Sequence, residues 1–142
     1  MKFKKPEQRT ESPIKVSANV GAPTSLDWRD YNGKNYVTSI KDQGSCGSCW
    51  TFATNAYAES RLIIKGTHDT DLDLSEQYLL ECTPECDCNG GYMENVMKQA
   101  LQGVPLEETY PYTPYSTYYG ICSASGVHIA YKNYDHYNLT DD

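Results

Sequence analysis

Six cysteines in a chain of 142 residues limit the possible folds of this sequence more than any other feature. Such a count is typical of a disulfide framework, of a zinc site, or of a catalytic thiol with disulfides around it. A redox dithiol is a further possibility, because Cys46 and Cys49 have the Cys-x-x-Cys spacing. Tryptophan follows this pair instead of preceding it, which disfavours a thioredoxin-like site. The run Cys86-Asp87-Cys88 is too tight for a usual zinc knuckle.

Charge and hydropathy exclude two other classes of protein. The net charge of −7 argues against nucleic-acid binding, which needs a basic face. The densest apolar run, Leu62-Ile63-Ile64, is far too short to span a membrane, and no signal peptide is visible. Residues 1–22 are polar and carry five Lys/Arg against two Asp/Glu. We interpret them as a polar leader or propeptide remnant before a domain over residues 23–142.

Apolar spacing and end signals predict three helices. The first begins at Cys49, and Gly66 would cap its C-terminal end. Ser75 is a good N-cap for a short second helix, and the third follows Gly90-Gly91 and ends at Gly103. The expected buried face of the first helix is Cys49, Phe52, Ala53, Ala56, Tyr57 and Ile63, and that of the third is Met93, Val96, Met97, Ala100 and Leu101. Strand-like composition occurs over residues 35–40 and 127–131.

The segment from Gln43 to Trp50 carries the clearest chemistry. Cys49 lies at the expected N-terminus of a helix, where the helix dipole favours the thiolate, the nucleophilic form of cysteine. The Cys49 N–H would be an unpaired donor of the first turn, able to bind an oxyanion. Gln43 offers a second, uncharged donor, and Gly47 lets the backbone approach a substrate closely. Cys49 and Gln43 are therefore the candidate catalytic residues.

Cys46-Gly47-Ser48-Cys49-Trp50 resembles the signature around the nucleophile of papain-like cysteine peptidases. Further stretches resemble the same family in the same order: Leu26-Asp27-Trp28-Arg29, the run from Leu74 to Cys82, Cys88-Asn89-Gly90-Gly91-Tyr92, and Tyr110-Pro111-Tyr112. The resemblance covers roughly residues 24–122. It implies an α+β papain-like fold, present here mainly as the helical left-hand domain and truncated before the β-rich right-hand domain.

The resemblance also implies how the cysteines are used. It pairs Cys46 with Cys88 and Cys82 with Cys122, and it leaves Cys49 free as the nucleophile. Cys86 departs from the family pattern, either as a free thiol or as a competitor of Cys88. Disulfides imply an oxidising compartment, so a secreted, lysosomal or vacuolar protein is expected.

The glycine pair Gly90-Gly91 has two interpretations. It can simply form a turn, or its bare backbone can pair with an extended peptide substrate. The resemblance favours the second, with Tyr92 and Met93 lining part of the pocket for the residue before the scissile bond. Aromatic and apolar residues after a turn also commonly belong to the core.

The histidines do not provide an evident catalytic base. None of His68, His128 and His136 has the surroundings of the family's histidine, and 93 residues follow Cys49, whereas the family's His and Asn come about 130–150 residues after the nucleophile. We therefore expect a peptidase that acts through a thioester acyl-enzyme and needs no cofactor, present as a fragment without its base. The alternatives are a non-catalytic decoy or binding module, or one chain of a processed enzyme whose second chain or domain supplies His and Asn.

Overall fold

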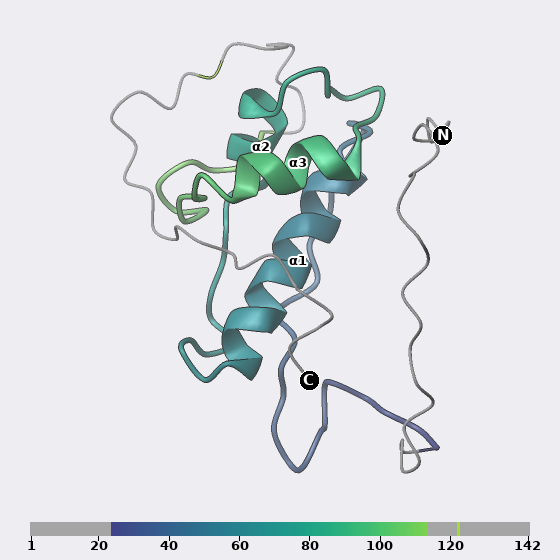
Figure 1. Cartoon of the computed structure of the whole chain (residues 1–142), viewed down its shortest axis with the longest axis vertical. Coiled ribbons are helices and arrows are strands. Elements are labelled where there is room, and N and C mark those ends of the chain that lie inside the picture. The colour runs from purple at the N-terminus through teal and green to yellow at the C-terminus, as the bar shows by residue number, and fades with distance from the viewer. Residues whose placement is uncertain (1–23, 114–121, 123–142) are drawn as a thin grey trace, which may run out of the picture.

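The computed structural model describes residues 24–113 and Cys122. This part contains three helices, α1 (Cys49–Ile64), α2 (Glu76–Cys82) and α3 (Met93–Ala100). Figure 1 shows α2 and α3 beside the N-terminal half of α1, and each of the three helices packs against the other two. β-Structure within the described ranges is limited to isolated bridges. The mainly helical architecture predicted for this part of the chain is confirmed.

The ends of α1 and α2 have the local capping residues that the sequence predicts. The Ser75 hydroxyl accepts a hydrogen bond from the Tyr78 N–H at 3.0 Å and so caps α2. At the end of α1, Gly66 has φ +73° and donates its N–H to Ile63 O, while Thr67 donates to Leu62 O. This pair of bonds is a Schellman motif, which requires the left-handed conformation that glycine adopts at no steric cost.

The buried face of α1 differs from the predicted one. Ile63 is buried, but Ala53, Ala56 and Tyr57 are exposed and Phe52 is only partly covered. The buried residues of α1 are instead Trp50, Thr51, Thr54, Asn55, Ala58, Glu59 and Ile63. Each polar residue among them makes at least one hydrogen bond, because an unpaired polar group away from water costs free energy, although Asn55 Oδ1 has no partner among the described residues. Thr51 and Thr54 donate to main-chain carbonyls one turn earlier, and Asn55 donates to Leu74 O.

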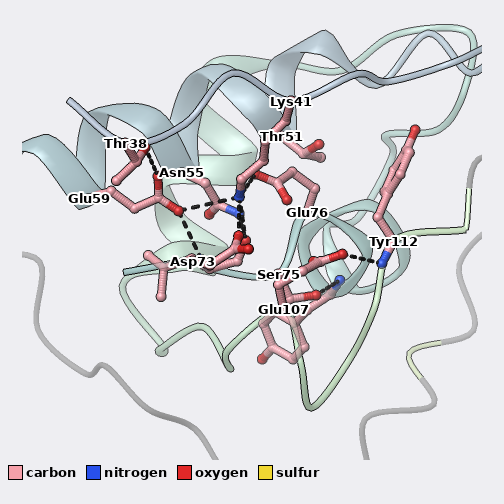
Figure 2. A network of polar contacts seen from close by, with 12 residues as sticks. Thr38, Lys41, Thr51, Asn55, Glu59, Asp73, Ser75, Glu76, Glu107 and Tyr112 are labelled. Atoms are coloured by element: carbon pink, nitrogen blue, oxygen red, sulfur yellow. Dashed lines mark hydrogen bonds and ion pairs between the residues drawn. The ribbon is translucent and has the colours of Figure 1, made fainter. Parts of the chain in front are cut away.

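This polar face of α1 borders an ion-pair cluster centred on Lys41 (Figure 2). Lys41 Nζ lies 2.9 Å from Glu76, 2.5 Å from Asp73 and 3.5 Å from Glu59. Glu59 also accepts hydrogen bonds from Thr38 Oγ1 and from the Leu74 N–H. The cluster therefore joins α1, the start of α2 and the segment that leads into α1.

The strand predicted over residues 35–40 is wrong. The segment is irregular, because Asn35 bonds both the N–H and the C=O of Val37 and so closes a local loop. Ile40 is fully exposed, so the strand-like composition there does not mark a core face. The strand expected over 127–131 lies outside the described residues. No helix in the described ranges is long and apolar enough to cross a bilayer.

Candidate active site

Cys49 is the first residue of the 16-residue helix α1, as the sequence predicts. Its thiol is free and partly exposed. Ser48 occupies the N-cap position, but its side chain makes no capping hydrogen bond to the first turn. The Ser48 hydroxyl instead pairs with the Tyr112 hydroxyl at 2.7 Å. The start of α1 therefore presents an accessible sulfur at the positive end of a helix dipole.

A disulfide and a close backbone contact fix the loop before Cys49. Cys46 is bonded to Cys88, one of the two pairs that the sequence resemblance implies. The Gly47 N–H donates to Cys88 O at 2.8 Å. A Cβ at Gly47 would lie 2.3 Å from that same oxygen, so only glycine fits there. Close packing against Cys88 therefore requires glycine at position 47, in addition to the expected close approach of the backbone to a substrate.

Gln43 lies in the same loop, three residues before Cys46. Its Nε2 donates to Cys46 O at 2.7 Å. An amide nitrogen carries two N–H groups, so this bond uses one donor and leaves capacity for a second acceptor. The backbone carbonyl of Gln43 accepts a hydrogen bond from the Tyr112 hydroxyl at 2.8 Å. Tyr112 was missed as a site residue; the only sequence signal for it is the run Tyr110-Pro111-Tyr112.

The turn that contains Gly90 and Gly91 lies directly against the first turn of α1. Asp87 and Gly90 exchange two backbone hydrogen bonds, and Gly90 has φ +135°. A Cβ at Gly91 would approach the Trp50 ring to 2.5 Å, and the Trp50 indole donates to Asp87 O at 3.3 Å. The turn is therefore packed onto the residue that follows Cys49.

Tyr92 and Met93 continue from this turn into α3. Tyr92 is the N-cap of α3 and is partly buried, and Met93 is 48% exposed. Met93 is therefore not part of the core face of α3, whereas Val96 and Ala100 are buried as predicted. Gly91, Tyr92 and Met93 are consecutive in the chain and lie at the N-terminal end of α3.

The remaining cysteines divide into one bonded pair and one free thiol. Cys82 is bonded to Cys122, the second implied pair, and Cys86 is free and buried. Burial raises the pKa of the Cys86 thiol, although the Tyr92 N–H donates to its sulfur at 3.3 Å. Because Cys46, Cys82 and Cys88 are in disulfides, they are not available as zinc ligands, and Cys46 is not available as a dithiol partner of Cys49. Within the described ranges there is no group of three or more His, Cys, Asp or Glu residues that could hold a metal ion.

His68 lies at the wrong end of α1 to act on Cys49. It follows Thr67, whose N–H closes the C-terminal end of the helix, and its Nδ1 is 3.0 Å from Thr67 Oγ1. With a rise of 1.5 Å per residue, the two ends of α1 are roughly 20 Å apart. His128 and His136 lie outside the described residues.

Comparison with known proteins links the chain to one family. The family model described as papain family cysteine protease matches residues 22–142. Cysteine proteinase 1 of Entamoeba histolytica is 46% identical over 100 residues, which are 67% of this chain and 31% of that protein. A cathepsin L-like proteinase of Fasciola hepatica is 34% identical over 124 residues, covering 80% of this chain and 36% of that protein. The chain thus spans about a third of the length of these relatives.

Solved structures show the same likeness in three dimensions. The bromelain protease of Ananas comosus, in complex with the inhibitor E64, aligns with a TM-score of 0.65 and 37% identity. The alignment covers 77% of this chain and 48% of bromelain. Procathepsin L2 of Tenebrio molitor aligns with a TM-score of 0.63 and 34% identity, over 75% of this chain and 34% of that one.

Proposed function

The chain belongs to the papain family of cysteine proteases, and we propose that it carries the nucleophile and oxyanion-binding part of a peptidase active site. One observation carries the proposal. A free, partly exposed thiol starts a long helix, and a disulfide and a close backbone contact hold the loop before it. A buried structural cysteine would need neither exposure nor this setting, as Cys86 illustrates.

The reaction that this geometry supports is amide hydrolysis in two steps. Cys49 attacks the carbonyl carbon of a peptide bond as the thiolate, which the helix N-terminus favours. The carbonyl oxygen becomes an oxyanion, for which the Cys49 N–H and the second N–H of the Gln43 amide are the proposed donors. The oxyanion collapses and the C–N bond breaks as the amine takes a proton from a general acid outside the described residues, which leaves Cys49 acylated as a thioester. Water then hydrolyses the thioester to a carboxylic acid and the free thiol.

The substrate would be a peptide or protein bound in an extended conformation. We infer that Gly91 offers its backbone to the peptide, next to Gly90 and Gly47, and that Tyr92 and Met93 line part of a side-chain pocket. The 48% exposure of Met93 supports this role, because a core methionine would be covered. The two disulfides and the cathepsin-like relatives fit a protein of the secreted or lysosomal type.

The general base is the part that the described residues do not provide. His68 follows the far end of α1, roughly 20 Å along the helix axis from Cys49, and we infer that His and Asn come from outside the described residues. A further domain or a second chain would supply them. The lack of a general base among the described residues also favours the alternative, a non-catalytic binding module. Without general acid–base help a peptidase would lose a factor of about 10²–10⁴ in rate.

The experiment that tests the proposal compares the 142-residue chain with the full-length gene product. Both are assayed with a fluorogenic peptide and, separately, with iodoacetamide. We expect rapid alkylation at Cys49 in both proteins, and peptide hydrolysis by the full-length product alone. Cys49→Ala should abolish hydrolysis, whereas Cys86→Ala, the matched control, should retain it.

Two results would contradict the proposal. Hydrolysis that survives in Cys49→Ala would refute the assignment of the nucleophile. A full-length product that binds peptides without cleaving them would favour the binding module. Cys49-dependent turnover by the 142-residue chain alone would instead show that one of its own histidines, or a second copy, serves as the base.

A further inference from the structure

We propose that Tyr112 is a positioning residue, whose hydroxyl holds Gln43 and Cys49 in the relative position that catalysis needs. The inference rests on the proposed function, because it assigns Tyr112 an effect on the oxyanion donor and the nucleophile. Its basis is a pair of hydrogen bonds that converge on one oxygen. Tyr112 Oη lies 2.8 Å from Gln43 O and 2.7 Å from Ser48 Oγ.

The protons of these two bonds can be assigned without ambiguity. A carbonyl oxygen can only accept, so Tyr112 must donate its single hydroxyl proton to Gln43 O. Ser48 must then donate its own proton to Tyr112 Oη. The result is a directed chain from Ser48 through Tyr112 to Gln43. It connects the residue before the nucleophile to the backbone of the proposed oxyanion donor, across the two ends of one short loop.

The other supports of the loop between those ends are the Cys46–Cys88 disulfide, the hydrogen bond from the Gly47 N–H to Cys88 O, and the bond from Gln43 Nε2 to Cys46 O. Gly44 and Ser45, by contrast, are exposed, and the Gly44 N–H donates to the side chain of Asp42 at 2.8 Å. The Cys46–Cys88 disulfide fixes the middle of the loop and Tyr112 fixes its two ends. Loss of the hydroxyl would leave the carbonyl of Gln43 without this donor and the buried Ser48 hydroxyl without this acceptor.

Tyr112 is itself held firmly enough to act as an anchor. Its backbone N–H donates to Glu107 at 2.5 Å, as Figure 2 shows, and its ring meets the Phe52 ring edge-on with centroids 5.0 Å apart. The next residue, Thr113, donates its N–H to Gln77 Oε1 in α2. The hydroxyl is therefore presented by a ring that α1 supports and by a backbone that α2 and Glu107 support.

If Tyr112 only filled space with its ring, phenylalanine could take its place without loss of activity. The test therefore uses Tyr112→Phe, which keeps the ring against Phe52 and removes only the hydroxyl. Tyr110→Phe is the matched control, because it deletes a hydroxyl two residues away that bonds Glu81 in α2 instead of the loop. Gln43→Ala and the double variant Gln43→Ala/Tyr112→Phe complete a cycle that measures coupling.

Each variant of the full-length gene product is measured in two ways. Peptide hydrolysis gives kcat and KM, and amide hydrogen exchange gives the protection of residues 43–49. We expect Tyr112→Phe to lower kcat about tenfold with KM nearly unchanged, because a small misplacement of catalytic groups slows the chemistry. In the Gln43→Ala background the same change should cost less than about threefold, since the donor it positions is gone. Exchange at residues 43–49 should accelerate in Tyr112→Phe and not in Tyr110→Phe.

The outcomes separate this inference from the proposed function. Equal behaviour of Tyr112→Phe and Tyr110→Phe would overturn the positioning role, as would faster exchange with unchanged kcat. An undiminished effect in the Gln43→Ala background would overturn the route through Gln43. If the wild-type protein shows no turnover, the proposed function fails, and the exchange data together with the Cys49 alkylation rate still decide whether Tyr112 holds the loop.

Discussion

The ammonium of Lys41 lies 2.9 Å from the carboxylate of Glu76, which ties the segment that leads into α1 to the first residue of α2. Glu59 and Glu76 are each 1% exposed, while Asp73 is open to solvent. Three carboxylates therefore share one cation, and two of them are in the interior. Buried charges of this kind are stable only while they remain paired.

Replacing Lys41 with methionine should destabilise the fold by about 3 kcal/mol at pH 7.5, because it leaves buried carboxylates uncompensated. Urea unfolding with the disulfides intact measures the free energy of unfolding. The matched control is Lys98→Met, which removes an exposed lysine paired with Glu94 in α3 and should change stability by less than about 0.5 kcal/mol. Equal stabilities of the two variants would show that the Lys41 cluster contributes nothing.

The stability of the fold should fall as pH rises from about 5 to 7. Burial raises the pKa of Glu76 to about 7 from an ordinary value of 4.5, even though Lys41 opposes the shift. Between these two values the folded state holds a proton that the unfolded state has released. Its stabilisation is complete below pH 4.5 and is lost by the time pH passes about 7, an effect of at most about 3 kcal/mol.

Glu76→Gln isolates this contribution, because glutamine imitates the protonated acid and can still accept from Lys41. We expect the variant to lose most of the decline in stability between pH 5 and 7. A smaller decline should remain, since burial also raises the pKa of Glu107. Unfolding curves of both proteins across this pH range provide the measurement. A wild-type stability that rises toward pH 7 would contradict the role of Glu76.

The sequence predicted the helices well because their end signals are local. Ser75, Gly66 and Gly103 act through bonds within a few residues, and each lies at or just beyond a helix end in the structure. Cys49 likewise stands where the loop-to-helix pattern places it. These features depend on chain geometry close by, which a single sequence displays.

The buried face of α1 could not be predicted in the same way. Asn55 and Glu59 are buried because Leu74 and Lys41, distant in the sequence, provide their hydrogen-bond and ion-pair partners. Hydrophobic periodicity assigns such residues to the surface. The hydroxyl of Tyr112 was missed for the same reason, since its partners lie 64 and 69 residues earlier in the chain.

Gly47→Ala should destabilise the protein more than Gly66→Ala. The new Cβ at position 47 would meet Cys88 O at 2.3 Å, and the disulfide at Cys88 prevents that backbone from moving away. At Gly66 the space is open, and the cost of about 1 kcal/mol comes from a φ of +73° alone. Urea unfolding of the two variants gives the comparison, and a smaller loss for Gly47→Ala would contradict the close packing at Cys88.

The two free thiols should differ strongly in their reaction with iodoacetamide. Cys49 is partly exposed at a helix N-terminus, whereas Cys86 is 6% exposed and burial raises its thiol pKa. Because the thiolate is the reactive form and needs access to solvent, we expect Cys49 to be alkylated at least about tenfold faster at pH 7. Mass spectrometry of non-reduced peptides follows both sites and also reads the disulfide pairs. Urea should abolish the difference by exposing Cys86, so the denatured protein serves as the control for the effect of the fold on both thiols. Rapid alkylation of Cys86 in the native protein, or a Cys46–Cys86 disulfide in place of Cys46–Cys88, would contradict the structure at this site.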